Sequence, residues 1–288
     1  MGDASSRASL QTLYREHLAL GARFGDDAVV TSYAHEEEGV VQEHGQAVLC
    51  DITHAQVLYF AGPDAPAFAH AAFAIEPLSV GACAFGAVLT GDGKVTSIPL
   101  LARTGSQEYI ALDSTPRASV LDGWLSFLAH VSSDGYAPYA HMQAQDVTAK
   151  HVVLSLQGEA APSVLGDYVG EQTLPIPGHV ASVLLDRIPC IVLNVGTYET
   201  PSFVIMVPPN AAVVLWRSLL SFTEVAPVGT QTFVRMESRR HPWLARLCDT
   251  SDRLDFSREA LVRDALIRGT DDFVGARALR SQKEGELQ

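Results

Sequence analysis

The sequence predicts an α+β protein built from a duplicated unit, with antiparallel or mixed sheets. Apolar runs of strand length come in pairs around turns, with helices interspersed, whereas a doubly wound parallel sheet requires strict β-α alternation. The pattern G-x-x-A-P also follows an apolar run twice, at Gly62–Pro66 and at Gly158–Pro162. A repeat of roughly 100 residues fits this spacing. We therefore expect two α+β halves, residues 1–145 and residues 146–288, the second with a helical C-terminal tail.

In the first half, leucines at helical spacing predict a helix over residues 8–24. Residues 46–62 predict one long strand, or two strands with a bend near Asp51. Residues 82–103 contain two apolar runs around a G-D-G turn, which is typical of a β-hairpin. A short strand at 107–112 and a helix at 114–131, with Ser114 as its N-cap, complete this half.

The second half repeats this order. Residues 147–169 predict a strand, a glycine turn and a helix, and residues 180–208 predict further apolar strands. Residues 208–222 predict a helix with an aliphatic and Trp face. The charged tail after Thr250 predicts a helix that ends with Gly269 as its C-cap.

Composition limits the function. The 288 residues are 47% hydrophobic and can bury a real core. A net charge of -13 makes nucleic acid and anionic membranes poor partners. The four cysteines form no C-x-x-C pair, which favours free thiols in a reducing compartment. Because no signal peptide or membrane-length apolar run is present, we expect a soluble, cytoplasmic protein.

Common ligand motifs are absent or incomplete. The G-P-D-A-P turn at Gly62 could hold a phosphate at a helix N-terminus, but it lacks the several glycines of a dinucleotide loop. Its simpler interpretation is a strand-to-helix connection with Asp64 near the cap. Cys50, His54 and His44 do not have the tight spacing of zinc ligands, and no G-x-S-x-G elbow occurs. We predict no metal site.

Two segments hold charged residues in suggestive settings. Glu76 follows an apolar helix and precedes Pro77, so a partly desolvated acid there would suit proton transfer, and the alternative is a surface carboxylate. Residues 237–247 gather arginines around Trp243 and could bind a carboxylate or phosphate. The alternative for this second segment is a solvated helix start with salt bridges.

Four segments resemble, in order and spacing, the glycine cleavage T-protein (aminomethyltransferase) family, which includes folate-dependent demethylases and related oxidase domains. They are LYREHLALGAR at 13–23, LCDITHAQVLYFAGPDAPAF at 49–68, VLTGDGKVTS at 88–97 and VVLSLQGEAA at 152–161. Shorter similarities at 216–220, 227–229, 235–237 and 271–279 extend the resemblance over most of the chain. The resemblance implies the duplicated folate-binding unit of this family, tetrahydrofolate as cofactor, and transfer of a one-carbon unit.

The resemblance also implies site residues. Glu76 stands where the family has the acid of its N-D motif, with Ile75 in place of the Asn. Asp113 stands where the family usually has a folate-contacting Asn, and Phe85 stands where it usually has a Tyr. Glu199, or Thr200 after a one-residue gap, replaces the pterin-binding acid, which can accept paired hydrogen bonds. The remaining expected ligands are Tyr198 or Phe85, stacked on the pterin, and Arg235, Arg239 and Arg240, which would attract the carboxylate tail.

The function that follows from the resemblance is a tetrahydrofolate-dependent aminomethyl or methyl transferase. It would use a small-molecule donor and a carrier or corrinoid protein as partner. The family's C-terminal barrel domain is expected to be missing, so that a partner chain, for example in a homodimer, would supply one wall of the cavity. The cysteine motif of the iron-sulfur-related branch is absent. Because several site positions are substituted, the alternative is a non-catalytic folate-binding or assembly protein, and a scaffold that binds no folate is a third option.

Overall fold

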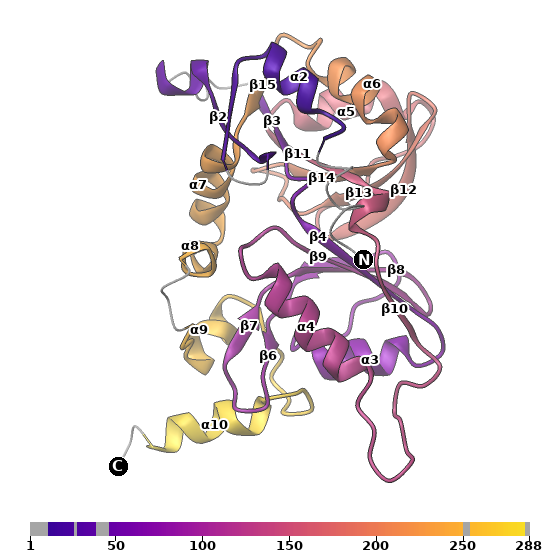
Figure 1. Cartoon of the computed structure of the whole chain (residues 1–288), viewed down its shortest axis with the longest axis vertical. Coiled ribbons are helices and arrows are strands. Elements are labelled where there is room, and N and C mark those ends of the chain that lie inside the picture. Colours follow the sequence, from indigo (N-terminus) through magenta and orange to yellow (C-terminus); the bar gives the residue numbers. More distant parts are fainter. Residues whose placement is uncertain (1–10, 26–27, 39–45, 250–253, 286–288) are drawn as a thin grey trace. The chain divides into compact units, whose positions relative to one another are not determined.

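The computed structural model describes residues 11–25, 28–38, 46–249 and 254–285 (Figure 1). The chain divides into two compact units, and each is described by itself. Unit 1 combines Met1–Ala55 with Val147–Pro242, and unit 2 combines Gln56–Asp146 with Trp243–Gln288. Both units mix helices with antiparallel strands, which confirms the predicted α+β class.

Unit 1 is built on a six-stranded sheet whose strands are antiparallel except for the last pair, β3 and β15, which is parallel. In spatial order the strands are β12 (His179–Leu185), β13 (Ile188–Asn194), β14 (Ser202–Val207), β11 (Val152–Gly158), β3 (Ala47–Asp51) and β15 (Val225–Val228). Helices α5 (Ala161–Val169) and α6 (Pro209–Leu219) bury their apolar faces against this sheet, with Trp216 as the largest fully buried side chain.

Smaller elements complete unit 1. They are α2 (Tyr14–Ala19), β1 (Ala22–Phe24), β2 (Val30–Tyr33), η2 (Ala34–Glu38), η3 (Thr148–Lys150) and α7 (Thr230–Arg240). The helix predicted over residues 8–24 is therefore shorter than expected. Gly21 adopts a positive φ of 73°, and the chain turns there into β1, which pairs with β2.

Unit 2 contains a fully antiparallel five-stranded sheet. In spatial order its strands are β10 (Gln143–Asp146), β4 (Gln56–Ala61), β9 (Glu108–Asp113), β8 (Leu100–Gly105) and β5 (Cys83–Phe85). The predicted G-D-G hairpin is present as β6 (Val88–Leu89) and β7 (Val95–Ser97). The helices are α3 (Ala65–Ala72), α4 (Ala118–Ala129), α8 (Pro242–Cys248), α9 (Arg258–Arg263) and α10 (Ala276–Gly285).

The two units share one internal order of elements. The series β4, α3, β5, β8, β9, α4 in unit 2 corresponds to β11, α5, β12, β13, β14, α6 in unit 1. In each sheet the first strand of the series lies between the last strand and one added antiparallel strand, β10 or β3.

The glycines of the two G-x-x-A-P turns also adopt the same conformation. Gly62 has a φ of 124° and Gly158 has a φ of 121°. The amide of Gly62 donates to the carbonyl oxygen of Gln107 just before β9, and the amide of Gly158 donates to that of Pro201 just before β14. A Cβ atom at Gly62 would lie 2.2 Å from the His141 oxygen, and one at Gly158 would lie 2.3 Å from the Gln46 oxygen. Only glycine fits so close to a neighbouring backbone, and this shared geometry supports the duplication.

The compact units divide the chain differently from the predicted halves at 1–145 and 146–288. The physical reason lies at residues 46–62, which form two strands, β3 and β4, in different sheets. The chain turns between them at residues 53–55, and the carboxylate of Asp51 at the end of β3 accepts hydrogen bonds from the amide and hydroxyl groups of Thr53. As a result, the N-terminal segment joins the second repeat, and the C-terminal segment joins the first.

Candidate functional site

Glu76 is the first exposed residue after a buried stretch in unit 2. Helix α3 ends at Ala72, and residues 73–75, which we call the exit segment, are buried. Glu76 and Pro77 that follow are exposed. Of the two alternatives from the sequence, the structure therefore shows a surface carboxylate, carried by a well-packed backbone.

Phe85 lies close to the exit segment. The neighbouring Gly86 is packed so tightly that a Cβ atom there would lie 2.6 Å from the Ile75 side chain. Phe85 itself contacts Trp243 edge to face, with ring centroids 5.2 Å apart. The structure thus brings Phe85 and the backbone that leads to Glu76 together, while the Phe85 ring already packs against Trp243.

Asp113 is a buried carboxylate at the end of β9. One of its oxygens accepts a hydrogen bond from the Ser97 hydroxyl at 2.6 Å, and the other accepts one from the Thr115 amide at 2.8 Å. Burial, together with the nearby Asp113 charge, raises the pKa of the Cys248 thiol. One carboxylate oxygen therefore holds the turn before α4 and the other holds the end of β7, which is a structural role that the sequence did not indicate.

Tyr198 and Glu199 lie in unit 1, on the loop between β13 and β14. The loop is closed by hydrogen bonds between Thr197 and Thr200, and Tyr198 is 81% exposed. Glu199 and Thr200 are exposed as well. The loop thus presents an aromatic ring and an acid to solvent.

The three predicted arginines lie on α7 and differ in their contacts. Arg235 is exposed and donates to the Thr232 hydroxyl at 2.7 Å, and Arg239, four residues later, is exposed on the same helix face. Arg240 instead pairs with the buried Glu237 at 3.0 Å. Burial raises the pKa of Glu237, although Arg240 and Gln157 oppose this effect. Arg240 is thus engaged within the fold, and Arg235 and Arg239 are the arginines that face solvent.

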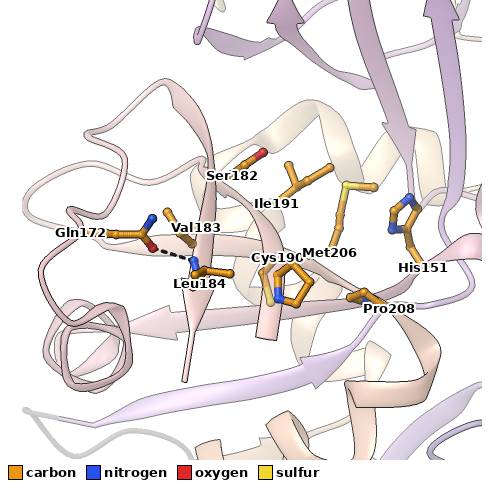
Figure 2. A pocket seen from close by; sticks show the side chains of 10 residues that line it. His151, Gln172, Ser182, Val183, Leu184, Cys190, Ile191, Met206 and Pro208 are labelled. Atoms are coloured by element: carbon orange, nitrogen blue, oxygen red, sulfur yellow. Dashed lines mark hydrogen bonds between the residues drawn. The ribbon is translucent and has the colours of Figure 1, made fainter. Parts of the chain in front are cut away.

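Unit 1 also contains a cavity of about 300 Å³ that the sequence did not predict (Figure 2). Its lining is mostly apolar and comes largely from β12, β13 and β14: His151, Gln172, Ser182, Val183, Leu184, Pro189, Cys190, Ile191, Met206 and Pro208. Burial lowers the pKa of His151, so its ring is neutral at pH 7. The Nδ1 atom of this ring is buried and has no hydrogen-bond partner among the described residues.

Within the described ranges, no three His, Cys, Asp or Glu side chains are grouped so that they could hold a metal ion. In the same part of the chain, no helix combines the length and apolar character that a membrane span needs.

Comparisons with known proteins agree with the fold. A family model described as the GCVT N-terminal domain matches residues 13–261. An aminomethyltransferase of Rubrobacter xylanophilus is 26% identical over 291 residues, covering 96% of this chain and 73% of the relative. One from Streptomyces coelicolor is 27% identical over 220 residues, covering 73% of this chain and 56% of the relative.

A solved structure gives the same result at the level of the fold. The glycine cleavage system aminomethyltransferase T from Bartonella henselae superposes with a TM-score of 0.73 at 20% sequence identity. The superposition covers 95% of this chain and 74% of that one.

Proposed function

Because the chain belongs to the family of the GCVT N-terminal domain, we propose that it is a tetrahydrofolate-dependent one-carbon transferase that moves an aminomethyl or methyl group. The observation that carries this proposal is the family match over residues 13–261. Relatives named as aminomethyltransferases support the same reaction class.

The residues expected to contact folate fit it in their chemistry. Folate carries a carboxylate tail, which the exposed guanidinium groups of Arg235 and Arg239 complement in charge. Its pterin ring has N–H groups that donate hydrogen bonds, and a carboxylate such as that of Glu199 can accept them. The flat face of the same ring can stack on the aromatic ring of Tyr198 or Phe85. When bound, tetrahydrofolate supplies the nitrogen that carries the one-carbon unit.

In this proposal Glu76 is the catalytic acid or base. Its carboxylate stabilises a positive charge or holds a proton at the reacting nitrogen. Asp113 acts indirectly, because one of its oxygens binds the turn before α4 and the other binds Ser97 at the end of β7. Arg240 stays with Glu237 and supports the helix that carries Arg235 and Arg239.

The second candidate is a non-catalytic folate-binding or assembly protein. The observation that favours it is the exposure of Glu76, which is also preceded by Ile75. A carboxylate surrounded by water stabilises charge far less than one in a dry site. We further propose a small-molecule donor, a carrier or corrinoid protein as partner, and a reducing cytoplasm as the location.

Calorimetric titration with tetrahydrofolate, combined with a turnover assay, tests the proposal. Glu76→Gln is expected to keep folate affinity within about threefold but to lower turnover by about 10²–10⁴-fold, the usual contribution of general acid-base catalysis. Glu171→Gln, which changes an exposed acid of unit 1, serves as the matched control and is expected to change neither quantity.

The outcomes separate the candidates. Absence of binding at high micromolar folate would reject both of them. Binding without turnover of any aminomethyl or methyl donor would favour the non-catalytic alternative. Full turnover by Glu76→Gln would remove Glu76 from the mechanism.

A further inference from the structure

We propose that Arg268 is a positioning residue for this site, because its guanidinium group holds the backbone that carries Glu76. The inference rests on the proposed function. No sequence pattern predicts this role, since Arg268 falls in a stretch that predicts a continuous helix up to Gly269. In the structure α9 ends at Arg263, and Ala265 has a positive φ of 55°, so that Arg268 leaves the helix and turns inward.

Arg268 is 2% exposed and binds four backbone carbonyl groups at the end of α3. Its Nη1 donates to the oxygens of Phe73 and Ile75 at 3.0 and 2.9 Å. Its backbone amide donates to the oxygen of Ala74 at 2.7 Å, and Nη2 donates to that of His70 at 2.9 Å. Every carbonyl of the exit segment is therefore held by this one residue.

Asp272 compensates the buried charge of Arg268. Its carboxylate accepts a hydrogen bond from Nε of Arg268 at 2.7 Å and lies 2.7 Å from Nε2 of His70. Hydrogen bonds from Thr270, Arg268 and His70 hold the pKa of Asp272 well below its usual range. The Asp272 carbonyl accepts a further bond from Nη2 at 3.0 Å. All five N–H groups of the guanidinium thus have acceptors, which fixes its plane.

A second arginine holds the chain on the far side of Glu76. Nη1 of Arg103 donates to the oxygen of Leu78 at 2.9 Å, and its guanidinium lies over the Tyr109 ring at 5.4 Å. Between these two anchors lie only Glu76 and Pro77, and the proline ring fixes its own φ. The Glu76 side chain is exposed, but its point of attachment is fixed from both directions.

The Glu76 side chain is exposed, so a catalytic role requires that the backbone hold it in place, and the two arginines do this. A reacting group displaced by about 1 Å loses about a hundredfold in rate. The planar guanidinium group of Arg268 holds several carbonyl groups in fixed directions at once, which the flexible ammonium group of a lysine cannot do. A lysine would therefore be a poor replacement at this position.

Arg268→Lys in the full-length protein tests the inference. It is expected to lower kcat by about 10–100-fold while KM and folate affinity stay within about threefold. Arg280→Lys is the matched control, because Arg280 pairs with Asp271 at the surface and does not bind the exit segment. Its kcat is expected to equal that of the unmodified protein, and an equal kcat for Arg268→Lys would overturn the inference.

A double variant distinguishes positioning from general scaffolding. If Arg268 acts through Glu76, Arg268→Lys will lower kcat in the unmodified protein but will have no further effect in the Glu76→Gln background. A loss of equal size in both backgrounds would show a purely structural role and would overturn the inference.

Amide hydrogen exchange gives a readout that does not depend on folate. Exchange over residues 74–80 is expected to be at least tenfold faster in Arg268→Lys than in Arg280→Lys. Unchanged exchange in Arg268→Lys would overturn the inference, whether or not the unmodified protein shows turnover. Absence of turnover in the unmodified protein would by itself reject only the proposed function. Should Arg268→Lys fail to fold, Asp272→Asn replaces it, with the same expected direction in exchange and kcat.

Discussion

At the scale of single residues, Glu76 and Glu237 occupy opposite environments. Glu76 is exposed, whereas Glu237 is buried against Gln157 and Arg240. Burial of a charge costs free energy, and the ion pair with Arg240 offsets only part of that cost. The raised pKa of Glu237 reflects the part that remains. A strongly perturbed acid is often taken as a sign of catalysis. In this protein the perturbed acid, Glu237, packs α7 onto β11, and the proposed catalytic acid is Glu76, which is exposed at the surface.

The pH dependence of stability tests the environment of Glu237. The pKa of Glu237 in the folded protein is raised above the ordinary 4.5. Its contribution to the free energy of unfolding is therefore fully present below pH 4.5 and is lost as the pH rises through the folded-state pKa. Glu237→Gln stays neutral throughout. As the pH rises from 4.5 through the folded-state pKa of Glu237, the free energy of unfolding of Glu237→Gln should therefore rise relative to that of the unmodified protein. The expected rise is about 1.4 kcal/mol per unit by which the Glu237 pKa is shifted.

Urea unfolding between pH 4 and pH 8 measures this difference. Glu16→Gln is the control, since hydrogen bonding to Arg217 lowers the pKa of Glu16. Its relative stability should change in the opposite direction with pH, and only weakly, because exposed pairs are screened by water. A pH-independent difference for Glu237→Gln would contradict the buried-acid interpretation.

At the scale of elements, the two G-x-x-A-P turns are the clearest link between sequence and structure. Each needs a glycine, because the chain has a positive φ and passes close to the backbone at the start of a neighbouring strand, His141 before β10 or Gln46 before β3. In each unit the helix that follows the turn, α3 or α5, packs its buried side chains into a core shared with the sheet. A residue pattern five positions long thus accompanies the same turn geometry before two corresponding helices.

Alanine substitution tests this role. Gly62→Ala and Gly158→Ala should each destabilise the protein by at least about 2 kcal/mol, since the new Cβ atom meets a carbonyl oxygen at a strained φ. Gly123→Ala on the exposed face of α4 meets no atom within 4 Å and should stabilise by about 0.5–1 kcal/mol. Denaturant unfolding measures all three, and a neutral Gly62→Ala would show that the turn can relax.

Local patterns predicted the elements whose geometry is local. The G-D-G hairpin, the helix around Leu121 and Leu125, and the glycine turns follow from residue order alone. Predictions failed where a single backbone angle decided the result, as at Gly21 after α2 and at Ala265 after α9. The contacts of Arg268 lie beyond such patterns, because its partners Phe73 and Ile75 are 195 and 193 residues away along the chain.

At the scale of the whole molecule, neither unit is continuous in sequence. Strand β3 pairs with β11 and β15, which follow it by more than a hundred residues. In unit 2, apolar residues of the hairpin such as Leu89 and Val95 share a core with Trp243 and Phe273 from the C-terminal segment. Each unit therefore needs both ends of the chain.

Separate expression of residues 1–145 and residues 146–288 tests this dependence. Each piece lacks strands or core residues that its partner supplies, so neither is expected to show a cooperative thermal transition by circular dichroism, whereas the full chain should. Cooperative unfolding of either piece alone would mean that a sequence-continuous half is sufficient to fold.

The discontinuity of unit 1 also has a consequence for synthesis on the ribosome. The apolar strand β3 ends at Asp51, and its neighbour β11 begins at Val152. At about 5–20 residues per second, the ribosome needs roughly 5–20 s to make the intervening chain. During that time β3 has no strand to pair with, and a strand with unpaired backbone groups is prone to aggregation. Residues 47–51 are therefore a segment that a nascent-chain chaperone would protect during synthesis.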